Sequence, residues 1–212
     1  MIKGYSHVIW DWNGTILDDA ALCVEIGNGL LERRGLPGLT LERYREIFCF
    51  PVRAYYEAAG FDFSSETFEV VGKEWMDEYE RRKSECGVRA GVADVLEAAG
   101  SLGIKQHIVS AYSQCSLRDM AASRGLARYF SSIRGLDNIY APGKIELARK
   151  LAGELAGEPG RVLLVGDTEH DFEAAAAIGA DCALLAGGHQ SRARLEKLGA
   201  RVVDSPGELL PR

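Results

Sequence analysis

Polar side chains that can bind a metal ion or a phosphate group follow apolar runs of this 212-residue sequence. They are Asp11, Asn13, Ser110, Asp167 and Asp171. In open α/β sheets the carboxyl ends of the strands meet at one edge, and ligands bind there. Acids at two separate strand ends, with a further acid four residues after the second, form the oxygen-rich set that Mg²⁺ prefers. Such a site suits phosphate esters.

The segments that must position these residues alternate between strand and helix after residue 87. Beyond the strand that ends at Asp11, the hydrophobic pattern predicts strands at 105–110, near 131–135, at 161–166 and at 181–186. Helices are predicted at about 91–102, 114–124, 144–156 and 170–178. This alternation is typical of a parallel sheet with helices on both faces. The predicted fold class is therefore α/β, with a Rossmann-like parallel sheet as its core.

A wholly helical segment separates the first strand from the others. Apolar residues at helical spacing run from Leu22 to Leu31, Pro51 opens a segment that ends at Gly60, and 65–83 is amphipathic. We therefore predict a helical cap domain at 19–87, inserted into a core domain made of 1–18 and 88–212. An insert at this place would close over the site as a lid.

The loop Phe48–Arg53 is the most distinctive part of the predicted cap, because it combines aromatic rings, a proline and a cation. We predict that Phe50 and Arg53 face the substrate; packing within the cap is an equally good alternative. His170 is either an exposed residue at a helix start or a group that contacts substrate. His189 has no predicted partner and is assigned a structural role.

Composition narrows the class of partner. The formal net charge of −6 and the isoelectric point near 5.3 argue against a nucleic-acid or anionic-membrane surface. No apolar segment approaches the length needed to span a membrane. The five cysteines are scattered and never form a C-x-x-C pair, so neither a disulfide framework nor a zinc site is indicated and a reducing, cytoplasmic setting is the simplest expectation. The expected partner is a small phosphorylated substrate, and no pattern specifies an oligomer.

Four motifs in this order resemble the haloacid dehalogenase-like hydrolase superfamily, in the branch similar to phosphoglycolate phosphatase with a helical C1-type cap. The family's D-x-D-G-T motif corresponds to 11–15, and its strand-end Ser or Thr to Ser110. Its helix-opening lysine matches Lys144, and its acidic fourth motif matches 166–171. The resemblance spans nearly the whole chain.

The resemblance implies a role for each matched residue. Asp11 would attack phosphorus and form an aspartyl phosphate. Asp11, Asp167 and the backbone oxygen of Asn13 would bind Mg²⁺ directly. Asp171 would not bind the ion itself but would hold a water molecule coordinated to it, or the Lys144 ammonium. The transferring phosphoryl group would be bound by Gly14, Thr15, Ser110, Ala111 and Lys144.

Asn13 departs from the family pattern. In the phosphatases of this family an Asp at this position protonates the leaving group and then activates water, whereas an amide has no titratable proton near neutral pH. General acid–base help is worth about 10²–10⁴ in rate. One reading is a phosphatase whose leaving group needs little protonation, or which uses another acid such as His170.

Two further readings stay open. One is cleavage of a carbon–halogen or phosphonate bond, although relatives with those activities typically carry Tyr or Ala at this position. The acidic fourth motif favours a Mg²⁺-dependent phosphoryl site over a metal-free dehalogenase. The other is a weakly active or inactive phosphate-binding or regulatory protein that keeps the fold and the metal site.

Overall fold

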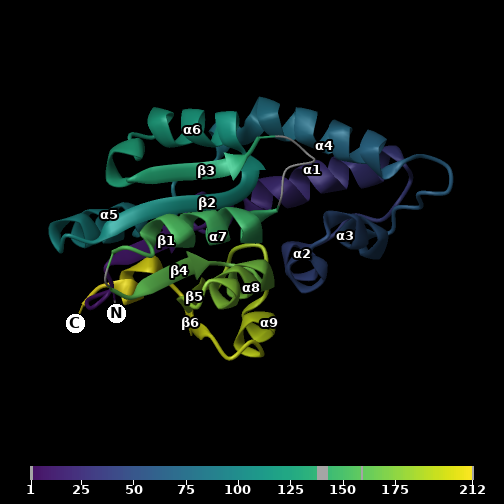
Figure 1. The fold of residues 1–212 in the computed structure, drawn as a ribbon. Helices are drawn as coiled ribbons and strands as arrows, with labels where there is room; N and C mark the ends of the chain where they lie inside the picture. Colours follow the sequence, from purple (N-terminus) through teal and green to yellow (C-terminus); the bar gives the residue numbers. More distant parts are fainter. Residues whose placement is uncertain (1, 138–142, 159, 212) are drawn as a thin grey trace.

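The computed structural model describes residues 2–137, 143–158 and 160–211, and within these residues it contains one six-stranded parallel sheet. The strands are β1 (His7–Trp10), β2 (Lys105–Ser113), β3 (Ser132–Leu136), β4 (Val162–Gly166), β5 (Asp181–Leu185) and β6 (Arg201–Val203). Their order across the sheet is β3-β2-β1-β4-β5-β6 (Figure 1). The chain therefore builds one side of the sheet from β1 outward before it returns and builds the other. The predicted α/β class is confirmed.

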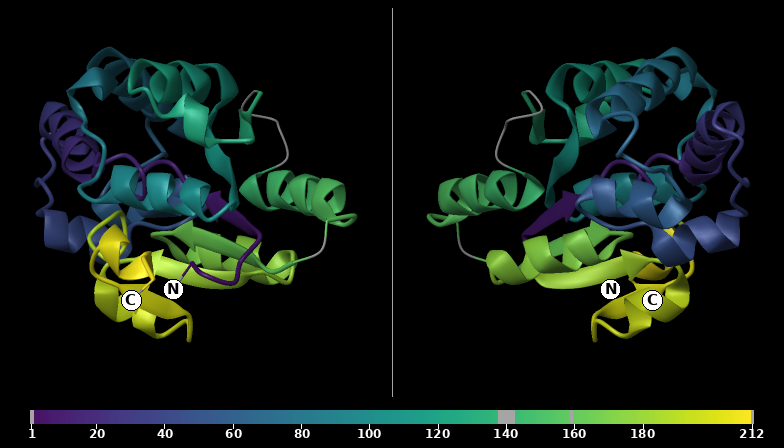
Figure 2. Two further views of the ribbon diagram at one scale, coloured as in Figure 1. Left: turned by 90° about the vertical axis from the view of Figure 1, so that its left-hand side faces the viewer. Right: turned by 90° about the vertical axis from the view of Figure 1, so that its right-hand side faces the viewer.

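Helices cover both faces of this sheet. They are α5 (Val92–Ser101), α6 (Gln114–Ser123), α7 (Lys144–Leu155), α8 (Glu169–Ala177) and the short α9 (Arg192–Glu196). Ile9, Val109 and Leu164 point to one face and pack with α7 and α8. Val8, Trp10 and others of the opposite face pack with α5 and α6. Figure 2 shows α5 and α7 on opposite sides of the sheet, as the alternation of side chains along a strand requires.

The predicted elements differ from the observed ones in two places. Strand β2 does not end at residue 110 but continues to Ser113, with a register shift against β3 after Val109. The sequence pattern also missed α9 and β6, because segments of five and three residues are too short to show a hydrophobic period.

Four helices lie between β1 and α5, at the end of the molecule beyond the carboxyl edge of the sheet (Figure 1). They are α1 (Ala20–Arg33), α2 (Leu41–Ile47), α3 (Val52–Ala59) and α4 (Phe68–Arg82). Thr40 begins α2 by accepting a hydrogen bond from the Arg43 N–H at 3.1 Å, and Gly60 ends α3 with a φ of 109°.

The chain leaves the core and returns to it side by side. The Asp18 N–H donates to the Gly87 carbonyl at 3.0 Å, and Leu17 and Val88 form an antiparallel bridge. One apolar cluster continues from the sheet into the helical segment, since Trp10 of β1 and Tyr79 of α4 both belong to it. The domain limits at 18/19 and 87/88 stay a prediction.

In the described parts of the chain, no helix combines the length and the apolar character that crossing a membrane would need.

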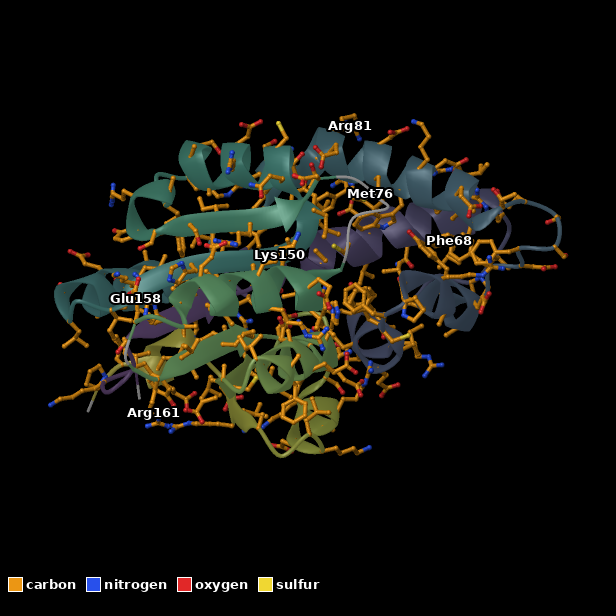
Figure 3. The ribbon with its side chains drawn as sticks, viewed as in Figure 1. Phe68, Met76, Arg81, Lys150, Glu158 and Arg161 are labelled. Atoms are coloured by element: carbon orange, nitrogen blue, oxygen red, sulfur yellow. The ribbon has the colours of Figure 1, made fainter. Side chains whose placement is uncertain are left out.

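Two buried histidines pack against each other near the amino-terminal edge of the sheet. Nδ1 of His7 lies 3.3 Å from Nε2 of His107, and the two rings are stacked. Figure 3 shows the neighbouring Glu158 at this end of the molecule, opposite Phe68 and Met76 on α4. Burial, followed by the charge that His7 would carry, lowers the pKa of His107 to about 4.

This pair makes folding sensitive to acid. Because the pKa of His107 is lower in the folded than in the unfolded chain, the unfolded chain binds more protons below about pH 6.5 and stability falls there. Each unit of pKa difference corresponds to about 1.4 kcal/mol. We expect the urea concentration at the unfolding midpoint to fall as the pH is lowered from about 7 to about 4.5, and to fall less in His107→Gln. An equal dependence of the midpoint on pH in the two proteins would contradict this role of His107.

Candidate active site

The two central strands carry an acid each at their carboxyl ends. Asp11 follows β1 and Asp167 follows β4, and the Asp11 N–H donates to the Val165 carbonyl at 2.9 Å. Asp171 reaches the same point from the first turn of α8. Oxygen atoms of the three carboxylates lie within 4.8 Å of one another, and all three residues are buried. The carboxylates meet where the strand order reverses, which is where α/β sheets bind ligands.

Lys144 brings a buried cation to this cluster. It is the first residue of α7, and its ammonium group contacts the carboxylates of both Asp11 and Asp171. Burial lowers the pKa of Lys144, but the two carboxylates outweigh this and raise it, so the side chain is charged. The second oxygen of Asp171 accepts from the Thr168 N–H at 3.0 Å and from the Thr168 hydroxyl at 2.7 Å. Asp171 therefore fixes both Lys144 and the turn that carries Asp167.

Asp167 is held from two other loops. One oxygen accepts from the Thr15 hydroxyl at 2.8 Å, and the other accepts from the His189 N–H at 2.6 Å. The loop after β1 passes so close that a Cβ on Gly14 would lie 2.3 Å from this carboxylate, and Gly14 has a φ of +73°. Only glycine fits there, since both the space and the backbone conformation exclude a side chain.

The cluster carries an excess of buried negative charge. Burial, with the charges of Asp171 and Asp167, raises the pKa of Asp11 against the opposing effect of Lys144. Burial also raises the pKa of Asp167. Carboxylates whose pKa is raised in this way are stabilised as anions by an added cation. The donor set therefore fits a divalent ion bound through oxygen.

Asn13 does not stand free at the site. Its Nδ2 donates to Asp19 Oδ2 and to the Tyr79 hydroxyl, both at 2.7 Å, and that hydroxyl donates to Asp19 Oδ2 at 2.7 Å. The Gly14 N–H donates to the other oxygen, Asp19 Oδ1, at 2.8 Å. The sequence reasoning missed Asp19 and Tyr79; the acidic pair that Asp19 forms with Asp18 after the first motif was the available signal.

His189 is a third residue near the cluster whose contacts were not expected from the sequence. It is 5% exposed, its Nε2 lies 3.4 Å from Asp19 Oδ1, and its Nδ1 lies 2.7 Å from the Tyr44 hydroxyl. Burial lowers the pKa of His189, but Asp19 and then Asp167 raise it to about 9. Although burial opposes it, the charge of His189 in turn holds the pKa of Asp19 below its ordinary value. The structural role expected for His189 on sequence alone is thus incomplete, because it is a cation beside the cluster.

The residues expected to bind phosphate fall into two groups. Ser110 is buried inside β2, where the register against β3 shifts, and its Oγ accepts from the Tyr112 N–H at 3.2 Å. Ala111 follows it and is half-buried. By contrast, the Gly14 N–H is bonded to Asp19 and the Thr15 hydroxyl to Asp167, so both groups act within the protein in this structure.

The cap loop approaches the site through Phe50 and not through Arg53. The Phe50 ring lies 4.7 Å from the ring of His170, which is half-buried, and Phe50 itself is 41% exposed. Burial, and then the charge of Lys144, lowers the pKa of His170. Arg53 instead pairs with Glu57 at 2.9 Å and lies over the ring of Phe63. These contacts match the alternative in which Arg53 packs within the cap.

The loop after β5 joins this cap to the side of the cluster that carries Asp167. Arg45 of α2 donates to the Gly188 carbonyl at 2.9 Å, and Gln190 donates to the Phe48 carbonyl at 3.1 Å. Arg194 of α9 donates to the same Phe48 carbonyl at 2.6 Å. The cap is therefore docked on the core in this structure.

The order and placement of these residues agree with a known family. The sequence pattern of the haloacid dehalogenase-like hydrolases matches residues 8–185, which include Asp11, Lys144, Asp167 and Asp171. The chain belongs to this family. It is a hydrolase of the branch similar to phosphoglycolate phosphatase.

Two relatives in this family match almost the whole chain. Phosphoglycolate phosphatase 1 of Pseudomonas aeruginosa is 26% identical over 217 residues, which cover 96% of this chain and 78% of the relative. The N-acetylmuramic acid 6-phosphate phosphatase of the same organism is 26% identical over 214 residues, covering 96% and 92%. The solved structure of protein tyrosine kinase A from Mycobacterium tuberculosis covers 98% of this chain and 97% of that one, with 21% identity and a TM-score of 0.81. Since proteins named as phosphatases and as a kinase share the fold, the site must decide the reaction.

Proposed function

We propose that this chain is a Mg²⁺-dependent phosphatase of small phosphorylated metabolites that carries the phosphoryl group on Asp11. The observation that supports it is the single buried cluster of Lys144 with the carboxylates of Asp11, Asp167 and Asp171. Asp11 is 8% exposed and the other two acids are fully buried, so Asp11 is the carboxylate placed to meet a substrate. All five cysteines are free, which suits the reducing, cytoplasmic setting that we also propose.

The metal would be held by Asp11, Asp167 and the backbone oxygen of Asn13, the oxygen ligands that Mg²⁺ prefers. When bound, it would neutralise charge on the phosphoryl oxygens. Asp171 is already engaged by Lys144 and Thr168, so we assign it to positioning and not to direct binding.

The chemistry then follows from the placement of the side chains. Asp11 attacks phosphorus, the bond to the leaving oxygen breaks, and a phosphoryl group remains on the Asp11 carboxylate. Water cleaves this aspartyl phosphate and releases inorganic phosphate. Lys144 stays beside the transferring oxygens as a point charge, with the Ser110 hydroxyl and the Ala111 N–H as further donors. Phe50 and His170 form the side of the site that would contact the rest of the substrate.

Asn13 favours substrates with a leaving group that needs no added proton. Its amide donates hydrogen bonds to Asp19 and Tyr79 and has no titratable proton to transfer to a leaving group. Acyl phosphates, which are mixed anhydrides, and phosphate esters of acidic hydroxyls such as phenols meet this requirement, because their leaving groups are stable anions. The same observation supports the second candidate, a weakly active or inactive phosphate-binding protein on this fold.

A panel of alkyl phosphates, aryl phosphates and acyl phosphates separates these candidates when phosphate release is measured with Mg²⁺ and with a chelator. A phosphatase of the proposed kind releases phosphate from the acyl and aryl compounds at least about 10²-fold faster than from alkyl esters, since general acid help is worth about that much. No release from any compound, together with saturable binding of phosphate, would support the binding protein instead.

Asp167→Asn tests the metal proposal without an activity assay. A ligand that binds only the folded state stabilises it, by about 2.7 kcal/mol at 100 times its dissociation constant. We expect Mg²⁺ to raise the melting temperature of the wild type by several degrees and to leave that of Asp167→Asn unchanged. Asp181→Asn is the matched control, because Asp181 is exposed at the start of β5 and pairs with Arg161. An equal rise in Asp167→Asn would remove Asp167 from the metal site.

A further inference from the structure

Asp19 lies at the junction of the three parts of the molecule that meet at the site. It stands immediately before α1, where the chain enters the helical cap, and it is 1% exposed. The partners of its side chain come from the loop after β1, from cap helix α4, from the loop after β5 and, through the Cys23 thiol at 3.8 Å, from α1 itself. Among the described residues, no other buried carboxylate accepts hydrogen bonds from both the cap and the loop after β1.

Asp19 receives only donors. Its Oδ1 faces the Gly14 N–H at 2.8 Å and Nε2 of His189 at 3.4 Å, and its Oδ2 accepts from Asn13 and from the Tyr79 hydroxyl. Because the Tyr79 hydroxyl donates to Asp19, it must accept from Asn13, and this fixes the Asn13 amide with its nitrogen toward both partners. The amide cannot flip without placing its oxygen against a carboxylate.

We propose that Asp19 is a positioning residue of this site. We also propose that position 13 carries an amide because the Asp19 carboxylate faces that side chain and needs a hydrogen-bond donor there. Asp19 holds the Gly14 N–H and the Asn13 side chain, and through them the loop that follows Asp11. Tyr79 makes this arrangement depend on a docked cap, since its hydroxyl completes the hydrogen bonds between positions 13 and 19.

The proposal predicts that the amide at position 13 and the carboxylate at position 19 can be exchanged with each other, but that replacing either one alone is unfavourable. Asn13→Asp alone brings two carboxylates to about the 2.7 Å that now separates Nδ2 and Oδ2. Asp19→Asn alone turns an amide nitrogen toward Asn13 or Gly14, both of which are donors. In the double variant the Gly14 N–H still donates to position 19, now to the amide oxygen, while the bond between positions 13 and 19 is restored with its direction reversed. Tyr79 then accepts from the new amide and donates to the new carboxylate, the reverse of its present role.

A double-mutant cycle tests this with urea unfolding and with steady-state kinetics. We expect each single variant to raise the unfolding equilibrium constant and the double variant to bring it back toward the wild-type value, with a coupling of about tenfold or more. Asp18→Asn is the matched control, because Asp18 is the exposed neighbour of Asp19 and should change neither measurement. Additive losses in the double variant, or no loss in either single variant, would overturn the proposal. If the singles cannot be obtained folded, a folded double variant supports it and an unfolded one contradicts it.

The kinetic readout rests on the proposed function, whereas the unfolding cycle does not, so the two can fail separately. On an acyl phosphate, whose leaving group needs no added proton, an acid at position 13 gives the leaving group no help. With this substrate a positioning role predicts that each single variant loses about 10-fold or more in kcat with a smaller change in KM, and that the double variant recovers kcat to about the wild-type value. A purely structural role would restore stability in the double variant without restoring kcat. An inactive wild type with intact coupling would refute the proposed phosphatase and leave the assignment of Asp19 standing.

Discussion

Asp11→Asn is expected to lower kcat on every accepted phosphate compound by about 10⁴-fold or more, the order of loss seen when the nucleophile of a covalent mechanism is removed. The physical reason is that the amide oxygen is a poor nucleophile and cannot hold the phosphoryl group. The fold should survive, because Lys144 keeps Asp171 as a partner and the backbone bond from Asp11 to Val165 is unaffected.

The measurement pairs phosphate release with detection of the covalent intermediate. Acid-quenched wild-type protein should carry phosphate on the peptide that contains Asp11, and the variant should carry none. Asp181→Asn serves as the control at an exposed acid of the same core. If Asp11→Asn keeps more than about a hundredth of the wild-type turnover, Asp11 is not the nucleophile and the proposed mechanism is wrong.

Lys144→Met is expected to cost about 10²–10³ in kcat, the typical effect of removing one group that stabilises developing charge in a closed site. It should also destabilise the fold by about 3–5 kcal/mol, because Asp11 and Asp171 lose a buried cation that contacts both of them. Methionine keeps the length and apolar stem of the lysine, so lost charge and not lost volume is what the variant reports.

Lys150→Met provides the comparison on the same helix. Lys150, which is labelled in Figure 3, is exposed, and its replacement should change neither kcat nor the urea midpoint by a measurable amount. A Lys144→Met protein that is destabilised but fully active would assign Lys144 to folding alone. A variant that is stable but inactive would mean that the charge of the acid cluster is balanced in another way.

Hydrophobic patterning was sufficient for the order of the elements. The apolar runs that become β1 and β4 are buried on both faces of the sheet, so their hydrophobicity is continuous and easily recognised. The acids that follow these strands could be expected at one edge, because parallel strands share that edge. Asp11, Asp167 and Asp171 do meet there, and Lys144 joins them from the start of α7.

Tertiary structure alone decided what surrounds that cluster. Asp19, Tyr79 and His189 are far apart in the chain. Asp19 forms an acidic pair with Asp18, but that pair does not reveal which groups Asp19 contacts across the fold. Their contacts exist because cap helix α4 and the loop after β5 both pack against the segment after β1 that carries Asn13 and Asp19. Arg53 is the opposite case, a residue that the sequence suggested for the site. Its place in a distinctive loop did not determine the direction of its side chain, which contacts Glu57 and Phe63.

The sequence by itself therefore determined the α/β core, the family and the acids of the candidate site, because these depend on local hydrophobic period and on motif order. The consequence of Asn13 needed the tertiary structure. Whether an amide at that position is a loss or a fitted part depends on which groups face it. Asp19 faces it from the same loop, and the Tyr79 hydroxyl, which fixes the orientation of the amide, reaches it from α4 only when the cap and the core pack together.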